Sequence, residues 1–105
     1  MIAKNRIDEA VNMLKEAAHP ERIILFGSYA RGEATEESDI DFLVIESQVS
    51  DYRMEMVRLR RVLRPLRIPV DVIVATESQV KEWGELPGTA LYHALKEGKV
   101  VYEAH

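Results

Sequence analysis

Two carboxylates lie two residues apart in the segment Ser38-Asp39-Ile40-Asp41, at the start of an apolar run that ends at Ile45. Because side chains alternate between the two faces of a strand, Asp39 and Asp41 should point the same way, about 6.6 Å apart along the strand. Carboxylates held this close repel each other unless a cation lies between them. Magnesium takes oxygen ligands and keeps positions free for phosphate and water, so the pair predicts a Mg²⁺ site.

A third carboxylate, Asp71, interrupts an apolar stretch from Ile68 to Val74 that is typical of a central strand. Burying an unpaired carboxylate is costly, so we expect a cation beside it. A metal ion is favoured over the alternative, a salt bridge to an arginine. If this strand lies beside the strand of Asp39, three carboxylates meet at one place. Such a site suits two metal ions that hold the attacking and leaving oxygens of a phosphoryl transfer.

The turn Gly27-Ser28 precedes these aspartates in the chain. Glycine lets the backbone turn sharply and approach a ligand closely, and a helical turn over residues 29–31 would direct N–H groups at a phosphate. Ser28 adds a hydroxyl donor. Arg31 either contacts the same phosphate or pairs with a nearby glutamate, and both interpretations stay open. The glutamates within reach are Glu33, Glu36 and Glu37.

Each motif also has an interpretation without a function in binding or catalysis. Asp39 and Asp41 could be solvent-exposed residues at the start of a strand, and Gly27-Ser28 could be an ordinary turn. For the glycine and serine alone, the ordinary turn would be preferred. The combination with Asp71 reverses this preference, since a carboxylate within an apolar strand is rarely unpaired. The three elements together therefore favour a nucleotide and metal site.

The elements that hold these residues follow from apolar periodicity and from turn residues. Strands that alternate with helices predict an α/β or α+β domain with a mixed sheet, while the strand order stays open. The last strand is short enough for a sheet edge. We expect helices over residues 3–18 and 29–31, from a cap at 50 or 51 to about 65, over 76–83 behind a capping box, and over 89–97, with strands over 22–26, 39–45, 68–75 and 99–102.

The composition narrows the function classes. The 105 residues, 47% of them hydrophobic, predict one domain over residues 1–105. A net charge of -4 argues against stable nucleic-acid binding through phosphate neutralisation. The lack of cysteine, of a signal-peptide pattern and of a long apolar run predicts a cytoplasmic protein that does not bind membranes.

A basic cluster stands out in this acidic chain between residues 53 and 67. We interpret it chiefly as a solvated helix face, with a smaller part in docking a partner. No aromatic residues alternate with the arginines, as a single-strand binding surface would require. The cluster consists of Arg53, Arg58, Arg60, Arg61, Arg64 and Arg67.

These motifs resemble those of the minimal nucleotidyltransferases (MNT) of the DNA polymerase beta superfamily. The similarity spans nearly the whole chain and includes the closing segment 94–102. It implies the nucleotidyltransferase fold, a mixed sheet flanked by helices. The residues that carry the resemblance are Gly27-Ser28, the run 30–34, Ser38 to Asp41, and Asp71.

The resemblance also implies roles. Asp39, Asp41 and Asp71 would be the catalytic metal ligands for two Mg²⁺ ions, and Gly27 and Ser28 would bind the phosphates of ATP. In members of this size, it further implies an antitoxin whose partner is a HEPN-domain ribonuclease toxin. The antitoxin would silence the toxin by transferring AMP from ATP to a toxin tyrosine.

The reaction expected from this site is in-line attack of an acceptor hydroxyl on the α-phosphorus of a nucleoside triphosphate. So short a chain leaves no room for an acceptor-binding domain, which favours a protein acceptor that docks on an open cleft. Two alternatives remain: an antitoxin that only binds its partner, and a small-molecule nucleotidyltransferase of the aminoglycoside type. The sequence does not decide whether the chain forms homo-oligomers.

Overall fold

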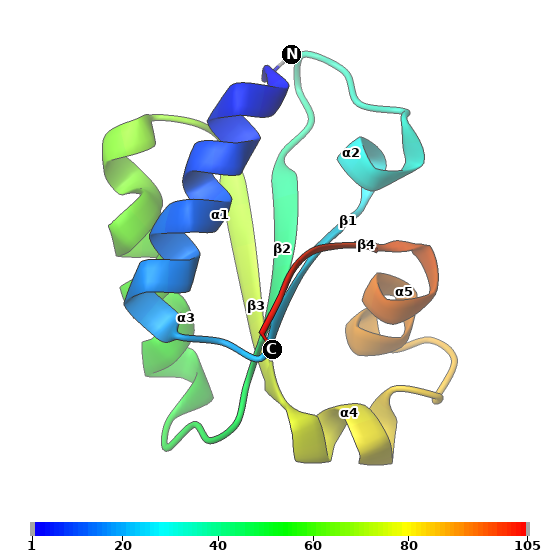
Figure 1. Cartoon of the computed structure of the whole chain (residues 1–105). Coiled ribbons are helices and arrows are strands. Elements are labelled where there is room, and N and C mark those ends of the chain that lie inside the picture. The colour runs from blue at the N-terminus through cyan, green and yellow to red at the C-terminus, as the bar shows by residue number, and fades with distance from the viewer. Residues whose placement is uncertain (1, 105) are drawn as a thin grey trace.

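The computed structural model describes residues 2–104 and places a sheet between two layers of helices (Figure 1). Helices over residues 4–18 and 52–63 lie on one side of the sheet, and a helix over residues 90–97 lies on the other. The elements in chain order are α1 (Lys4–Ala18), β1 (Arg22–Phe26), α2 (Ser28–Arg31), β2 (Ile40–Glu46), α3 (Tyr52–Leu63), the 3₁₀ turn η1 (Arg64–Leu66), β3 (Val70–Thr76), α4 (Glu77–Trp83), α5 (Ala90–Glu97) and β4 (Lys99–Glu103).

The sheet is mixed, as the sequence predicts. Its strand order is β3-β2-β1-β4. Strand β1 runs antiparallel to β2 and to β4, whereas β2 and β3 are parallel and are connected through α3. The predicted edge position of the last strand is confirmed, and β3 forms the opposite edge.

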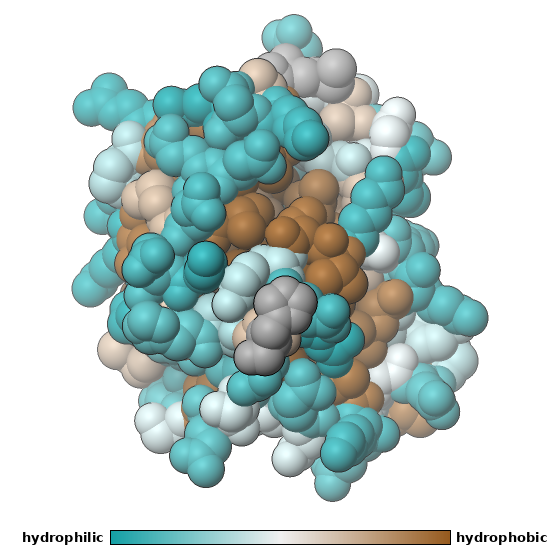
Figure 2. Space-filling view, in the orientation of Figure 1, coloured by the Kyte–Doolittle hydropathy of each residue, from teal (hydrophilic) through white to brown (hydrophobic). Residues whose placement is uncertain are grey.

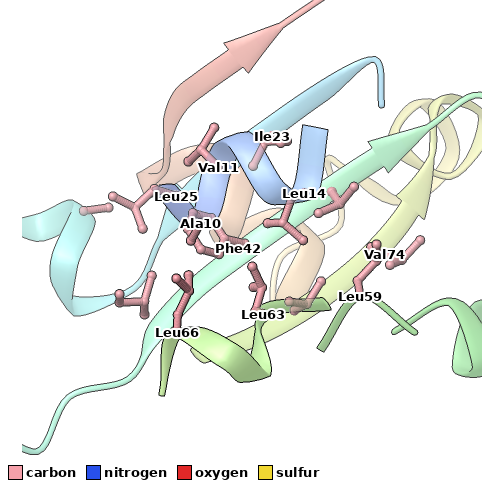
Figure 3. Close-up of a cluster of buried hydrophobic side chains, with 14 residues drawn as sticks. Ala10, Val11, Leu14, Ile23, Leu25, Phe42, Leu59, Leu63, Leu66 and Val74 are labelled. Carbon is pink, nitrogen blue, oxygen red and sulfur yellow. The ribbon is translucent and has the colours of Figure 1, made fainter. Parts of the chain in front are cut away.

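The larger core cluster lies between the sheet and the helices α1 and α3 (Figure 3). Strand β2 contributes Ile40, Phe42 and Val44 to it, and all three are fully buried. Leu14 of α1 and Leu63 of α3 pack against them. Alternation along the strand predicts these three side chains in the core, because they point away from the face of Asp39 and Asp41. The structure confirms that prediction.

The second core cluster covers the other face of the sheet. Leu43 and Ile45 of β2 and Ala75 of β3 are buried there against Ala94 of α5. Val80 of α4 packs on its margin. Because side chains alternate along a strand, Asp41 points to this same face. The alternation predicts that Leu43 and Ile45 continue the face of Asp41 as it becomes apolar, and the structure confirms this.

Prolines and caps set several boundaries. Pro69 has no N–H, but its carbonyl accepts a hydrogen bond from the Ile40 N–H at 2.9 Å, which aligns the starts of β2 and β3. Asp51 caps α3 by accepting from the Met54 N–H at 3.0 Å. Thr76 and Gln79 form the predicted capping box at the start of α4.

The surface is mostly hydrophilic, with apolar patches toward the centre of the face drawn in Figure 2. The edge strand β4 contributes exposed apolar residues, with Val100 55% and Val101 36% exposed. Within residues 2–104, no helix combines the length and the apolar character that a bilayer crossing requires.

Candidate active site

The centre of the candidate site is a pair of carboxylates on neighbouring strands. Asp41 of β2 is the register partner of Asp71 of β3. Because the strands are parallel and in register, the two side chains leave the same face of the sheet side by side. The strand adjacency on which the predicted carboxylate site depends is therefore confirmed.

Gly27 closes this site from the side of β1. Phe26 pairs with Asp41, so Gly27 leaves the strand next to the carboxylate. Its backbone has φ 76° and ψ -157°, a region that residues with a Cβ rarely adopt. A Cβ built on Gly27 would collide with Oδ2 of Asp41. Only glycine lets the turn approach Asp41 this closely.

The short helix α2 starts directly after this glycine. The N–H groups of Ala30 and Arg31 both donate to the Gly27 carbonyl at 3.1 Å. The N–H groups of Ser28 and Tyr29, at the very start of the helix, have no acceptor within it. Two backbone donors and the Ser28 hydroxyl therefore follow directly after Gly27, whose position lies against Asp41. Such a turn suits an anion such as phosphate.

Asp39 lies at the end of the loop that leads into β2. The loop is held by hydrogen bonds from the Thr35 N–H to Ser38 Oγ at 2.9 Å and from the Ser38 N–H to the Thr35 carbonyl at 3.1 Å. Asp39 itself is exposed and directly precedes the first residue of β2. It is thus available to a ligand that approaches from solvent.

The electrostatics of the site penalise its negative charge. The pKa of Asp41 is raised, first by burial of its carboxylate and then by the charges of Asp71 and Asp39, while Arg31 acts in the opposite direction. A bound cation would relieve this repulsion. The donor set of carboxylate oxygens and the space that Gly27 leaves at Asp41 both fit Mg²⁺.

Asp71 has a protein cation beside it. Its Oδ1 accepts from the Arg60 guanidinium at 2.5 Å and from the Val72 N–H at 3.0 Å. The arginine salt bridge, which the sequence offers as the alternative for Asp71, is therefore present. Within residues 2–104, no three His, Cys, Asp or Glu side chains are gathered closely enough to form a metal cluster.

Comparison with known proteins agrees with this geometry. The sequence pattern of the family described as "Nucleotidyltransferase domain" matches residues 7–98. The chain belongs to the nucleotidyltransferase domain family. The enzyme class predicted from the sequence is thereby confirmed.

Relatives of this nucleotidyltransferase domain occur in the archaeon Methanocaldococcus jannaschii. One, which carries the provisional name protein adenylyltransferase MJ0604, is 35% identical over 97% of this chain and all of its own length. A second, provisionally named protein adenylyltransferase MJ0128, is 43% identical over 59% of this chain and 63% of its own length.

Solved structures share the fold. A toxin-antitoxin crystal structure with AMP-PNP superposes with a TM-score of 0.66 and 21% identity, over 99% of this chain and 76% of that chain. A complex of a tri-AMPylated HEPN toxin with its MNT antitoxin from Shewanella oneidensis gives a TM-score of 0.61 and 18% identity, over 96% of this chain and 72% of that one. The predicted nucleotidyltransferase fold is confirmed.

Arg31 of the nucleotidyltransferase domain makes ion pairs in the structure. Its Nε donates to Glu33 at 3.2 Å, and a terminal nitrogen donates to Glu97 of α5 at 3.1 Å. Both hydrogen bonds raise the pKa of Arg31. The sequence names Glu33 as a partner but gives no sign of Glu97, which comes from 66 residues further along the chain.

The sequence analysis missed a buried carboxyl at the other end of β2. Glu46 is only 8% exposed and shares a side-chain hydrogen bond with Glu55. Burial, followed by the interactions with Glu55, raises the pKa of Glu46 to about 8. Arg58 holds Glu55 with two hydrogen bonds of 2.7 Å. The available signal was the position of Glu46 directly after the apolar run that ends at Ile45.

Proposed function

We propose that this chain is a Mg²⁺-dependent protein adenylyltransferase, which transfers AMP from ATP to a hydroxyl group of a partner protein. The observation that carries the proposal is the register pairing of Asp41 with Asp71 beside the Gly27 turn. A relative that matches 97% of the chain bears a protein adenylyltransferase name, which supports the same reaction.

The chemistry assigns a task to each part of the site. The N–H groups that follow Gly27 and the Ser28 hydroxyl bind the phosphates of ATP, and Arg31 can add a charged donor at the rim. Asp39, Asp41 and Asp71 would hold two magnesium ions. Bound there, the metal supplies charge neutralisation of the phosphates and a lower pKa for the acceptor hydroxyl.

The transfer itself is a substitution at the α-phosphorus. The acceptor oxygen forms a bond to this phosphorus, the bond to the oxygen that bridges to the β-phosphorus breaks, and pyrophosphate leaves. The hydroxyl proton passes to solvent. Because Asp41 and Asp71 fix the reacting groups side by side, positioning and charge neutralisation provide most of the rate enhancement.

The partner we propose is a HEPN toxin, with a tyrosine as the acceptor, so that the chain acts as a cytoplasmic antitoxin. A solved complex of this fold pairs an MNT antitoxin with an AMPylated HEPN toxin. The site is open, because Asp39 is exposed and the side chain of Asp71 is 47% exposed. An open site suits a large protein acceptor better than a small molecule that must be enclosed.

The test is label transfer to a co-purified HEPN partner in the presence of Mg²⁺. Label from ATP carrying ³²P at the α-phosphate should appear on the partner, whereas label at the γ-phosphate should not. The variant Asp39→Ala/Asp41→Ala should abolish transfer. The control Asp8→Ala/Glu9→Ala removes two exposed carboxylates of α1 and should transfer normally.

Two outcomes would contradict the proposal. Transfer of the γ-label would indicate a kinase reaction instead of adenylylation. Inhibition of the toxin by the Asp39→Ala/Asp41→Ala variant, together with no label transfer by the unmodified chain, would indicate an antitoxin that acts by binding alone.

A further inference from the structure

We propose that Arg60 competes with the divalent cation for Asp71 and so sets the metal affinity of the site. The inference rests on the proposed function, since it takes Asp41 and Asp71 as metal ligands. Its starting point is that one guanidinium already neutralises the carboxylate that the reaction requires.

Arg60 reaches Asp71 from the far side of the sheet. Its helix α3 packs on the sheet face opposite the Asp71 side chain, through Leu59 and Leu63. The guanidinium crosses the free edge of β3, where it also donates to the Val72 carbonyl at 3.3 Å. Arg60 can therefore reach Asp71 because β3 is an edge strand. The contact does not involve Asp39, Asp41 or the Gly27 turn.

The neighbouring arginines show that this contact is specific. Arg58 is engaged by Glu55 and by the Ala17 carbonyl. Arg61 directly follows Arg60 and is exposed, and it has no hydrogen bond or ion pair. Among these consecutive basic residues of α3, Arg60 is the one that holds the carboxylate beside Asp41.

A metal ion could displace Arg60 from Asp71 at little cost in stability. The side chains of Arg60 and Asp71 are each 47% exposed, and ion pairs with this exposure add little stability. The Oδ1 atom of Asp71 already accepts hydrogen bonds from two donors. A metal ion that coordinates this atom would be repelled by the positive charge of the Arg60 guanidinium. Metal binding and the arginine contact should therefore exclude each other.

The experiment is a Mn²⁺ titration in the presence of α,β-methylene-ATP, which cannot transfer AMP, with free Mn²⁺ followed by electron paramagnetic resonance. Arg60→Gln should bind Mn²⁺ about two- to fivefold more tightly than the unmodified chain, as expected from the strength of an exposed ion pair. Arg61→Gln removes the same charge one residue away and should change the affinity less than about 1.5-fold at 0.15 M salt.

A double-substitution cycle separates competition from a general charge effect. In an Asp71→Asn background, Arg60→Gln should no longer alter Mn²⁺ affinity, because the group for which it competes is gone. Equal affinity of Arg60→Gln and the unmodified chain would overturn the inference, and so would weaker binding, which would make Arg60 a residue that positions Asp71.

The same titration distinguishes failure of the inference from failure of the proposed function. If the unmodified chain binds Mn²⁺ and Asp41→Asn does not, the metal site stands whatever Arg60→Gln does. If no variant binds Mn²⁺ with the nucleotide present, the proposed metal chemistry is wrong and the inference fails with it.

Discussion

Strand β2 carries one carboxyl near its start and another at its last residue, and the surroundings of the two differ in almost every respect. Asp41 has a second carboxylate in register beside it, a glycine turn against it and exposed Asp39 two residues before it. Glu46 is buried and shares a hydrogen bond with Glu55, whose charge is held by Arg58.

The difference distinguishes Asp41, the carboxylate that we propose binds a metal ion, from Glu46, a buried carboxyl that is surrounded by other side chains of the fold. At the Asp41 end, burial and neighbouring negative charges both act against the ionised form, and solvent can still reach the group. At the Glu46 end, the pKa of about 8 means that the fold keeps the proton near neutral pH. Of the two carboxyls, only Asp41 has surroundings in which a bound cation would relieve the repulsion between neighbouring negative charges.

The largest expected effect comes from Asp41→Asn. If Asp41 is the metal ligand that we propose, AMP transfer should fall by about 10³-fold, because the variant removes that ligand. The pKa of Asp41 is raised in the folded state, so its contribution to stability is full at low pH and lost as pH rises. The variant should therefore melt about 1 to 3 °C higher at pH 7. Calorimetry and label transfer measure the two effects, and transfer within tenfold of normal would contradict the assignment.

Gly27→Ala should reduce transfer more than it reduces stability. The new methyl group would displace the far end of the Asp41 side chain, and the positive φ adds about 1 to 2 kcal/mol of backbone strain. We expect transfer to fall about 10²-fold, since a displaced ligand misaligns the reacting groups.

The matched control is Gly32→Ala, which has φ 72° but no atom within 4 Å of the added Cβ. It should lose similar stability in urea unfolding and keep most of the transfer activity. If both variants lose activity in proportion to stability, the contact between Gly27 and Asp41 has no role in the reaction.

Glu46→Gln tests the other end of β2. The pKa of Glu46 rises from 4.5 to about 8, so its stabilising contribution is full below about pH 4.5 and is lost as pH rises toward 8. The lowered pKa of Glu55, due first to Arg58, has the opposite effect at acid pH. Glutamine keeps a donor for Glu55 without titrating.

Urea unfolding should find Glu46→Gln close to the unmodified chain at pH 5 and about 1 to 3 kcal/mol more stable at pH 8. Transfer activity at pH 7 should not change, because Glu46 lies at the end of β2 away from Asp41. The control Glu82→Gln, at an exposed position of α4, should show no pH-dependent difference. If the difference in unfolding free energy between Glu46→Gln and the unmodified chain is the same at pH 5 and pH 8, Glu46 is ionised in the folded state at both pH values.

The smallest effect is expected from Arg31→Gln. If Arg31 binds a phosphate, KM for ATP should rise about three- to tenfold while kcat changes little. Glu97→Gln removes one ion-pair partner without touching the arginine and should leave KM equal or lower. Steady-state kinetics on both variants test whether Arg31 binds a phosphate of ATP. An unchanged KM in Arg31→Gln would mean that Arg31 only forms its ion pairs with Glu33 and Glu97.

Much of this architecture could be predicted from local patterns. Alternation along β2 correctly predicted that Phe42 and Val44 point into the core and that Leu43 and Ile45 continue the face of Asp41 as it becomes apolar, although it did not predict a second core cluster there. Strand β1 has the predicted bounds, and the capping box at Thr76 forms as expected. These features depend on residues close in sequence, where periodicity and capping act directly.

The remainder depends on contacts between distant segments. No short-range pattern in the sequence predicts that β3 lies next to β2, although Asp41 and Asp71 come together only in that strand order. The contact of Arg60 with Asp71 follows from the position of α3 over the free edge of β3, and that of Arg31 with Glu97 follows from the packing of α5. Glu46 was missed because burial of a strand's last residue depends on the helix that covers it.

The most direct measurement is anomalous diffraction from crystals of the chain grown with Mn²⁺ and α,β-methylene-ATP. We expect an anomalous peak within about 2.3 Å of carboxylate oxygens of both Asp39 and Asp41, with the triphosphate against the turn that follows Gly27. A nucleotide bound elsewhere, or Mn²⁺ bound away from these two aspartates, would contradict the assignment of this end of β2 as the site of adenylyl transfer.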